Sequence, residues 1–142
     1  MDGRVVILVL ISLFIFSGCS EESYEKSNKV MFIAEEVNWS TENSSEDYWI
    51  NNTWEVSYDG TVKYSETYNL TGVKNKKNWK LKKDQLHLLQ DILENDFQKL
   101  EDEYDSAADG IGWNMVYYNK NSEEISEFDD FEKKSQVLNP ST

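Results

Sequence analysis

The chain has 142 residues, of which 39% are hydrophobic and 13% aromatic, and its formal net charge at pH 7 is −13. One proline and six glycines beside so many aromatic residues argue against intrinsic disorder, and the length suits one domain. The acidic balance disfavours nucleic-acid binding, because that function needs clustered lysine and arginine. It also disfavours a domain that lies flat on anionic lipid.

The amino terminus is typical of an export signal. Arg4 precedes twelve residues, 5–16, that are apolar except for one serine. As a helix this run would reach about 18 Å, well short of the roughly 30 Å hydrocarbon core of a bilayer. Charged residues follow from Glu21 onward, without a stop-transfer pattern. We therefore expect a cleavable signal over residues 1–18 rather than a membrane span.

The junction Phe16-Ser17-Gly18-Cys19 resembles the lipobox of prokaryotic lipoproteins, in which a cysteine follows two small residues and an apolar one. The resemblance implies cleavage between Gly18 and Cys19 and a lipid on the Cys19 thiol. This lipid would hold the protein on the cell membrane, facing outside the cytoplasm. The alternative is an ordinary secretory signal with an incidental cysteine. Cys19 is the only cysteine, so its lipidation would leave no thiol for a disulfide or for catalysis.

Beyond the signal we expect a polar tether over residues 19–29 and a single acidic α+β domain over residues 30–142. Residues 30–39 alternate as a first strand, and residues 40–47 are a polar loop. The apolar residues of this strand that share a parity are Met31, Ile33, Val37 and Trp39.

A β-hairpin is centred on Asp59-Gly60. A two-residue turn would place the apolar residues of its two strands on opposite faces. A three-residue loop, 58–60, places them on one face, with Gly60 at positive φ in a G1 bulge. We therefore predict the three-residue loop, with the pairs Ser57–Thr61, Val56–Val62, Trp54–Tyr64 and Glu55–Lys63.

The pattern then changes. Residues 69–78 are a basic, Asn-rich loop, and residues 82–94 have the apolar spacing of an amphipathic helix. A short 3₁₀-like turn with Phe97 and Leu100 follows, and then strands over residues 111–117 and 124–128. Two registers for this second hairpin stay open, with Ile125 opposite either Tyr117 or Val116. We expect a short amphipathic helix over residues 129–138. The helical face over residues 82–94 consists of Leu86, Leu89, Ile92 and Leu93.

The order hairpin, helix, hairpin predicts an α+β fold in which an antiparallel sheet of four to five strands packs on one main helix. Over residues 49–128 this pattern resembles small lipoprotein domains of unknown function in bacteria and archaea. No functional residue carries over from that resemblance.

The candidate sites for chemistry are sparse. His87, the only histidine, falls on the polar face of the helix, and no nucleophile motif accompanies it. Asp105 and Asp109 are weak calcium candidates, because their spacing does not match an EF-hand loop. We predict no catalytic residue, no metal and no cofactor. Possible glycosylation sequons begin at Asn38, Asn43, Asn51 and Asn69.

These observations favour a non-enzymatic, membrane-anchored binding, sensing or envelope-support module. Its partners would be the membrane, through the lipid, and an extracytoplasmic protein or polymer, not nucleic acid. The alternative is an envelope hydrolase or an inhibitor of one. A deep pocket with convergent carboxylates would favour the enzyme, and a shallow sheet face with an aromatic patch would favour binding. The aromatic residues expected to form such a patch are Tyr48, Trp49, Tyr117 and Tyr118.

Overall fold

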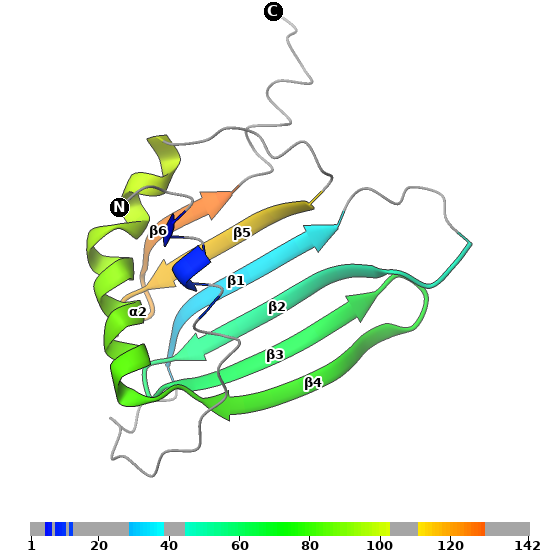
Figure 1. The fold of residues 1–142 in the computed structure, drawn as a ribbon, viewed down its shortest axis with the longest axis horizontal. Coiled ribbons are helices and arrows are strands. Elements are labelled where there is room, and N and C mark those ends of the chain that lie inside the picture. Colours follow the sequence, from blue (N-terminus) through cyan, green and yellow to red (C-terminus); the bar gives the residue numbers. More distant parts are fainter. Residues whose placement is uncertain are drawn as a thin grey trace, which may run out of the picture.

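The computed structural model describes residues 5–6, 8–10, 12, 29–38, 45–102 and 111–129. In these residues six strands form one antiparallel sheet, and the main helix lies across one end of it (Figure 1). The elements are β1 (Val30–Asn38), β2 (Trp49–Ser57), β3 (Thr61–Tyr68), β4 (Gly72–Lys80), α2 (Lys83–Asn95), the 3₁₀ helix η1 (Phe97–Asp102), β5 (Ile111–Tyr118) and β6 (Glu124–Asp129).

The predicted strand number and order are wrong. The sheet has six strands in the order β4-β3-β2-β1-β5-β6, and four of them precede the helix. The strand that follows η1, β5, pairs with the first strand, β1, and so joins the two ends of the domain. An arrangement of two separate hairpins around a helix therefore does not describe this chain.

The error comes from β4, which was expected to be a loop. Its sequence, GVKNKKNWK, has no apolar alternation, and nearly all of its side chains are exposed. An edge strand at a wet margin of a sheet needs no apolar face, and lysines there are common because they discourage aggregation. Only Trp79 of this strand packs against the core. The sequence of β4 therefore contains almost no apolar pattern from which its pairing with β3 could be predicted.

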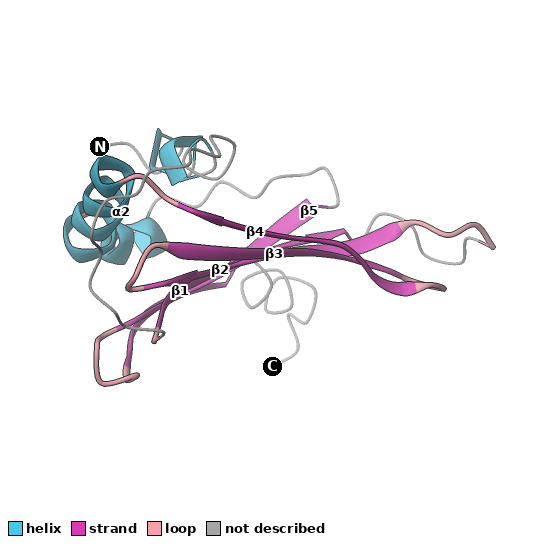
Figure 2. Ribbon diagram, turned by 90° about the horizontal axis from the view of Figure 1, so that it is seen from below, coloured by secondary structure: helices cyan, strands magenta, loops and turns pink. Residues whose placement is uncertain are grey.

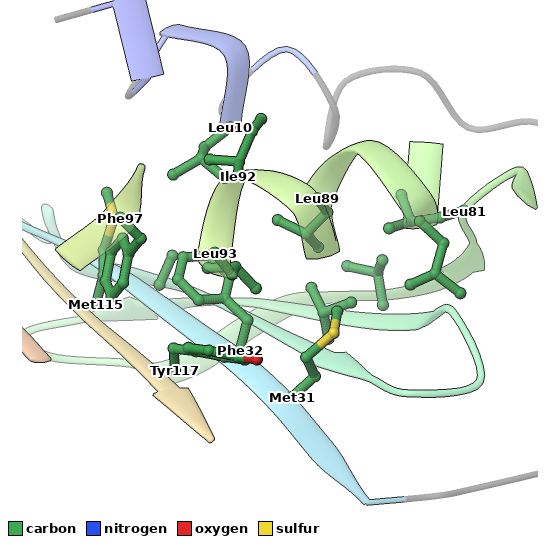
Figure 3. Packing of buried hydrophobic residues seen from close by; sticks show 14 of the residues in the cluster. Leu10, Met31, Phe32, Leu81, Leu89, Ile92, Leu93, Phe97, Met115 and Tyr117 are labelled. Carbon is green, nitrogen blue, oxygen red and sulfur yellow. The ribbon is translucent and has the colours of Figure 1, made fainter. Parts of the chain in front are cut away.

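The core lies between α2 and one face of the sheet. The predicted helical face is confirmed, because Leu86, Leu89, Ile92 and Leu93 are its buried residues. They pack with sheet residues that include Phe32 and Met115, and the ring of Phe97 meets that of Phe32 edge-on at 5.7 Å (Figure 3). Phe97 is buried at the start of η1, as predicted, whereas the side chain of Leu100 lies outside what the structure describes.

The helix covers only part of the face it packs on. Figure 2, which shows the sheet from its edge, places α2 on one face at one end of the strands. A helix is about 10 Å wide, whereas a nine-residue strand extends about 30 Å. More than half of the strand length therefore continues beyond α2.

The first hairpin has the predicted register. Val56 pairs with Val62, Trp54 with Tyr64, and Glu55 with Lys63. The loop between β2 and β3 has three residues, and Gly60 has a φ of 83°. The choice was predictable because only this register gathers the large apolar residues on one face.

Two other details of the sheet differ from expectation. A register shift between Val30 and Phe32 buries Met31 and Phe32 together, so Ile33 and Val37 lie on the face away from α2. In the second hairpin Tyr117 pairs with Ser126, which is neither predicted register. The pairing places Phe128 opposite Met115 in the core and leaves Ile125 44% exposed. Burying the larger side chain of Phe128 stabilises the sheet more than burying Ile125 would.

Residues of the amino-terminal apolar run also contribute to the core. Residues 5–6, 8–10 and 12 are helical, and Val6 and Leu10 are each only 1% exposed in the same cluster as α2. Figures 1 and 2 show this segment beside α2, on the same face of the sheet. None of the described helices is long and apolar enough to cross a bilayer.

Candidate functional site

Four aromatic side chains form a continuous row on the sheet face beyond α2. The rings of Trp113 and Trp54 have their centroids 5.8 Å apart, those of Trp54 and Tyr64 5.1 Å, and those of Tyr64 and Trp79 6.5 Å. We call Trp113, Trp54, Tyr64 and Trp79 the aromatic row. All four are half-buried, and the three tryptophans border the core. The row therefore forms the boundary between the buried core and the uncovered part of the face.

The strand register explains why these rings meet. Trp54 and Tyr64 are a directly paired residue couple on β2 and β3, and Trp79 of β4 pairs with Val62 one step closer to α2. Between Trp54 and β5 stands Ala34 of β1, which pairs with Trp54 on one side and with Met115 on the other. Because its side chain is only a methyl group, Trp54 can reach Trp113 over β1.

A row of polar side chains lies directly beyond the aromatic row. Glu36 pairs with Asn52, which pairs with Glu66, so the three share the face of the aromatic row on β1, β2 and β3. Asn52 Nδ2 donates a hydrogen bond to Glu36 Oε2 at 3.0 Å. The Tyr64 hydroxyl donates to Glu66 Oε1 at 2.7 Å and links the two rows. We call Glu36, Asn52 and Glu66 the polar row.

The two carboxylates of the polar row have different surroundings. Glu66 accepts hydrogen bonds from Asn75 Nδ2, the Tyr64 hydroxyl and the Tyr68 hydroxyl. These bonds, that of Asn75 first and that of Tyr64 next, lower the pKa of Glu66 below its usual value. Burial, followed by the nearby Glu66 carboxylate, raises the pKa of Tyr64, so its hydroxyl stays a donor. Glu36, in contrast, has one hydrogen-bond donor among the described residues.

The aromatic row also contains a donor without an acceptor. The indole Nε1 of Trp79 is buried and has no hydrogen-bond partner in the part of the chain that the structure describes. A buried N–H group normally has a partner, and an exception calls for a physical reason. Three other buried polar atoms of the described residues, Asn51 Oδ1, Asn114 Oδ1 and Ser126 Oγ, also have no partner there.

The carboxylates of the polar row can be compared with the needs of acid–base catalysis. A glycosidase needs a carboxylic acid whose pKa is raised, so that it can donate a proton to the leaving group. The lowered pKa of Glu66 does not suit that general-acid role. Rings that present apolar surface beside fixed amide, hydroxyl and carboxylate groups are instead typical of a ligand surface. Within the described ranges, no three His, Cys, Asp or Glu residues are grouped as metal ligands.

The aromatic residues expected on the surface do not form this site. Tyr117 is 8% exposed and belongs to the core, and Tyr48, Trp49 and Tyr118 are half-buried outside the aromatic row. Alternation with Val56 and Val62 places Trp54 and Tyr64 on the same face as those two valines, without showing how much of that face is covered. The length of the strands could have separated the row from the core. A single helix of 13 residues that crosses the strands covers only its own width of them, which is less than the length of a nine-residue strand.

The remaining candidates are only partly described. His87 is exposed on α2, as predicted. The sequon nitrogens of Asn38, Asn51 and Asn69 donate hydrogen bonds to Trp49 O, Glu35 Oε1 and Glu46 O, respectively. A glycan would replace one of the two hydrogens on each of these nitrogens. The predicted sites that lie outside the described residues are Gly18, Cys19, Asn43, Asp105 and Asp109. Of the helix expected over residues 129–138 only Asp129 is described, and it is the last residue of β6.

Comparison with family models, with curated proteins and with solved structures finds no match to this chain. The site must therefore be interpreted from its own geometry.

Proposed function

We propose that this chain is a membrane-anchored extracytoplasmic binding module whose ligand contacts the aromatic row. The observation that carries the proposal is the unbroken contact of Trp113, Trp54, Tyr64 and Trp79 at the edge of the core. The resemblance of residues 16–19 to a lipobox supports the anchor on Cys19.

The chemistry of the two rows favours a saccharide chain as the ligand. A sugar ring has apolar C–H faces that pack on aromatic rings, and hydroxyl groups at its edge that both donate and accept hydrogen bonds. Glu36 and Asn52 offer acceptor oxygens beside the rings. Tryptophan and tyrosine combine these two kinds of contact in one side chain. A polymer can follow the row across β5, β2, β3 and β4.

Intrinsic tryptophan fluorescence tests the ligand site directly. The full chain, dissolved in a nonionic detergent, is titrated with an oligomer of N-acetylglucosamine as a neutral saccharide probe. We expect a saturable change in emission that Trp54→Ala abolishes. Trp49→Ala is the matched control, because it removes the same residue type from the same strand but outside the row.

A second variant guards against a misfolded Trp54→Ala protein. Asn52→Ala leaves every ring in place and should weaken the same titration at least several-fold, with an unchanged circular dichroism spectrum. No emission change with the saccharide would contradict the ligand class, as would equal binding by the Trp54→Ala and Trp49→Ala chains. Binding of a lysine-rich peptide in place of the saccharide would also contradict it.

The anchor has its own test. Cys19→Ser should move the protein from the membrane fraction to a soluble or uncleaved form, because serine offers no thiol for the lipid. Two acyl chains, at about 0.8 kcal/mol for each buried methylene, provide durable attachment. A serine variant that is still lipid-labelled and membrane-bound would refute the anchor without affecting the ligand site.

A further inference from the structure

The Glu36 carboxylate stands directly beside the aromatic row. Glu36 of β1 pairs with Trp113 of β5 on one side and with Asn52 of β2 on the other, and the three strands are neighbours in the sheet (Figure 1). Trp113 in turn stacks on Trp54. Directly paired residues on one sheet face have Cβ atoms about 5 Å apart, so the Glu36 side chain is the immediate neighbour of an indole ring.

The negative charge of Glu36 also acts along the aromatic row. Burial, then Glu66, and then the Glu36 carboxylate raise the pKa of Tyr64. Aromatic rings have negatively polarised faces, so a carboxylate beside them acts on a ligand in the same sense as the rings do. Both attract a cation and both repel an anion. This part of the sheet face therefore discriminates between ligands by their charge.

The same face already holds one ammonium group between a ring and a carboxylate. Lys74 Nζ lies 4.7 Å from the centre of the Tyr68 ring and 3.1 Å from Asp47 Oδ2. In the strand register Lys74 is the partner of Glu66, and the Tyr68 hydroxyl donates a hydrogen bond to that carboxylate. On the β3–β4 side of the face, the chain thus supplies its own cation.

Glu36 has the ring and the charge without the cation. Among the described residues its carboxylate accepts one hydrogen bond, from Asn52 Nδ2 to Oε2, and it belongs to none of the ion pairs. The lysines of β4 are three strands away, about 14 Å at the usual strand spacing. That separation exceeds the Debye length of about 8 Å at physiological salt, so these lysines neutralise the Glu36 charge only weakly.

We propose that the saccharide chain bound at the aromatic row carries ammonium groups, and that Glu36 selects them. This inference rests on the function proposed above and narrows its ligand to amino sugars with free amines. Such a sugar packs its C–H face on the stacked rings of Trp54 and Trp113 and directs its ammonium group at the Glu36 carboxylate. A cation–π contact and a charge-assisted hydrogen bond then act on the ligand, and neither is available to a neutral sugar.

Oligosaccharides of equal length and different charge provide the test. The full chain in nonionic detergent is titrated by its tryptophan emission with tetramers of glucosamine, N-acetylglucosamine and galacturonic acid. At about pH 6 the amines of the first are protonated. We expect the glucosamine tetramer to bind at least about ten-fold more tightly than the N-acetylglucosamine tetramer, as one hydrogen bond between charged groups allows. The galacturonic acid tetramer should bind most weakly, and high salt should reduce these differences.

Two variants of neighbouring residues locate the selection. Glu36→Gln removes the charge and keeps an oxygen that can accept the hydrogen bond from Asn52, so the preference for glucosamine should disappear. Glu35→Gln is the matched control, because Glu35 lies on the opposite face of β1, where it accepts a hydrogen bond from Asn51. It should keep the wild-type preference. A general attraction of the acidic chain for cations would instead affect both variants alike, since their net charges are equal.

The outcomes separate this proposal from the one on which it rests. If the wild-type chain binds the cationic and the neutral tetramer equally, selection by Glu36 is overturned and the saccharide site stands. A preference that Glu36→Gln retains has the same consequence. If no tetramer changes the emission, both proposals fail. A lysine tetramer that binds as tightly as the glucosamine tetramer would show that charge alone is recognised, and this too would overturn the selection of an amino sugar.

Discussion

The indole ring of Trp54 on β2 stacks on that of Trp113 on β5, across the intervening strand β1, with the ring planes inclined by 23°. Strands on either side of a third are about 9.6 Å apart, so this contact needs both large rings and a small residue between them. Ala34, the direct partner of Trp54, is that residue.

Ala34→Leu should separate the two rings. Ala34 is only 1% exposed, and added methylene groups in a packed site cost about 1–3 kcal/mol. We expect a lower melting temperature and a weaker near-ultraviolet circular dichroism signal from the tryptophan pair. Ala34→Ser, which adds one small atom, should change the spectrum much less. Equal spectra for the leucine variant and the wild type would show that Ala34 does not control the stack.

Sequence patterns were sufficient for the elements whose signal is local. The helix was predictable because Leu86, Leu89, Ile92 and Leu93 follow its period, and the first hairpin because only one register collects Trp54, Val56, Val62 and Tyr64 on one face. In both cases the residues that form the apolar face are close together in the sequence.

The features that were missed depend on distant parts of the chain. The Lys-rich strand β4 is recognisable only when β3 lies beside it, because its own residues are polar on both faces. The aromatic row likewise could not be separated from the core. Alternation in the sequence indicates which residues lie on the same face of a strand, but it does not indicate how much of that face a helix covers. The join between β1 and β5 brings together residues about 80 positions apart and leaves no local pattern.

Gly60→Ala should destabilise the first hairpin. Gly60 has a φ of 83°, a region that costs an L-residue with a Cβ about 1 kcal/mol. Thermal unfolding of the purified chain measures the loss. Gly72→Ala is a useful companion, because its φ is 75° and a Cβ there would meet nothing within 4 Å. The two losses should therefore be similar if φ is the cause. An unchanged melting temperature in both variants would contradict this explanation.

The end of the sheet around Asp47 should loosen in acid. Its carboxylate accepts hydrogen bonds from the Thr71 hydroxyl, the Leu70 backbone N–H and Lys74 Nζ, and so ties the chain before β2 to the β3–β4 turn. These contacts, the Thr71 bond first, lower the pKa of Asp47 from 3.8 to about 2. The folded state therefore binds the proton less readily than the unfolded state does.

The ionised Asp47 carboxylate therefore stabilises the folded state. The contribution of Asp47 to stability is fully present above pH 3.8 and is lost as the pH falls towards 2. The protection of the Leu70 amide, which is its exchange rate relative to that of an unstructured chain at the same pH, should fall over this window, while the protection of amides in α2 changes less. In Asp47→Asn the Leu70 amide should be less protected at neutral pH, and its protection should depend less on pH. Exchange in that variant that matches the wild type at every pH would exclude the carboxylate as the cause.

The amino-terminal segment offers a matched pair of variants. Leu10 is 1% exposed in the core cluster, whereas Leu8, two residues away, is 66% exposed. Leu10→Asp should release the segment from its place beside α2 and forfeit about 2 kcal/mol, the value of burying one leucine. Leu8→Asp makes the same chemical change on the solvent side and should have little effect on thermal unfolding of the full chain.

The same two variants test what removal of residues 1–18 would expose. If residues 1–18 are removed, the surface that Val6 and Leu10 cover is exposed beside α2, close to the aromatic row. Leu10→Asp should mimic that exposure and increase the fluorescence of an apolar dye, whereas Leu8→Asp should not. Equal melting temperatures and equal dye binding for the two variants would mean that the segment does not contribute to the core of the folded chain.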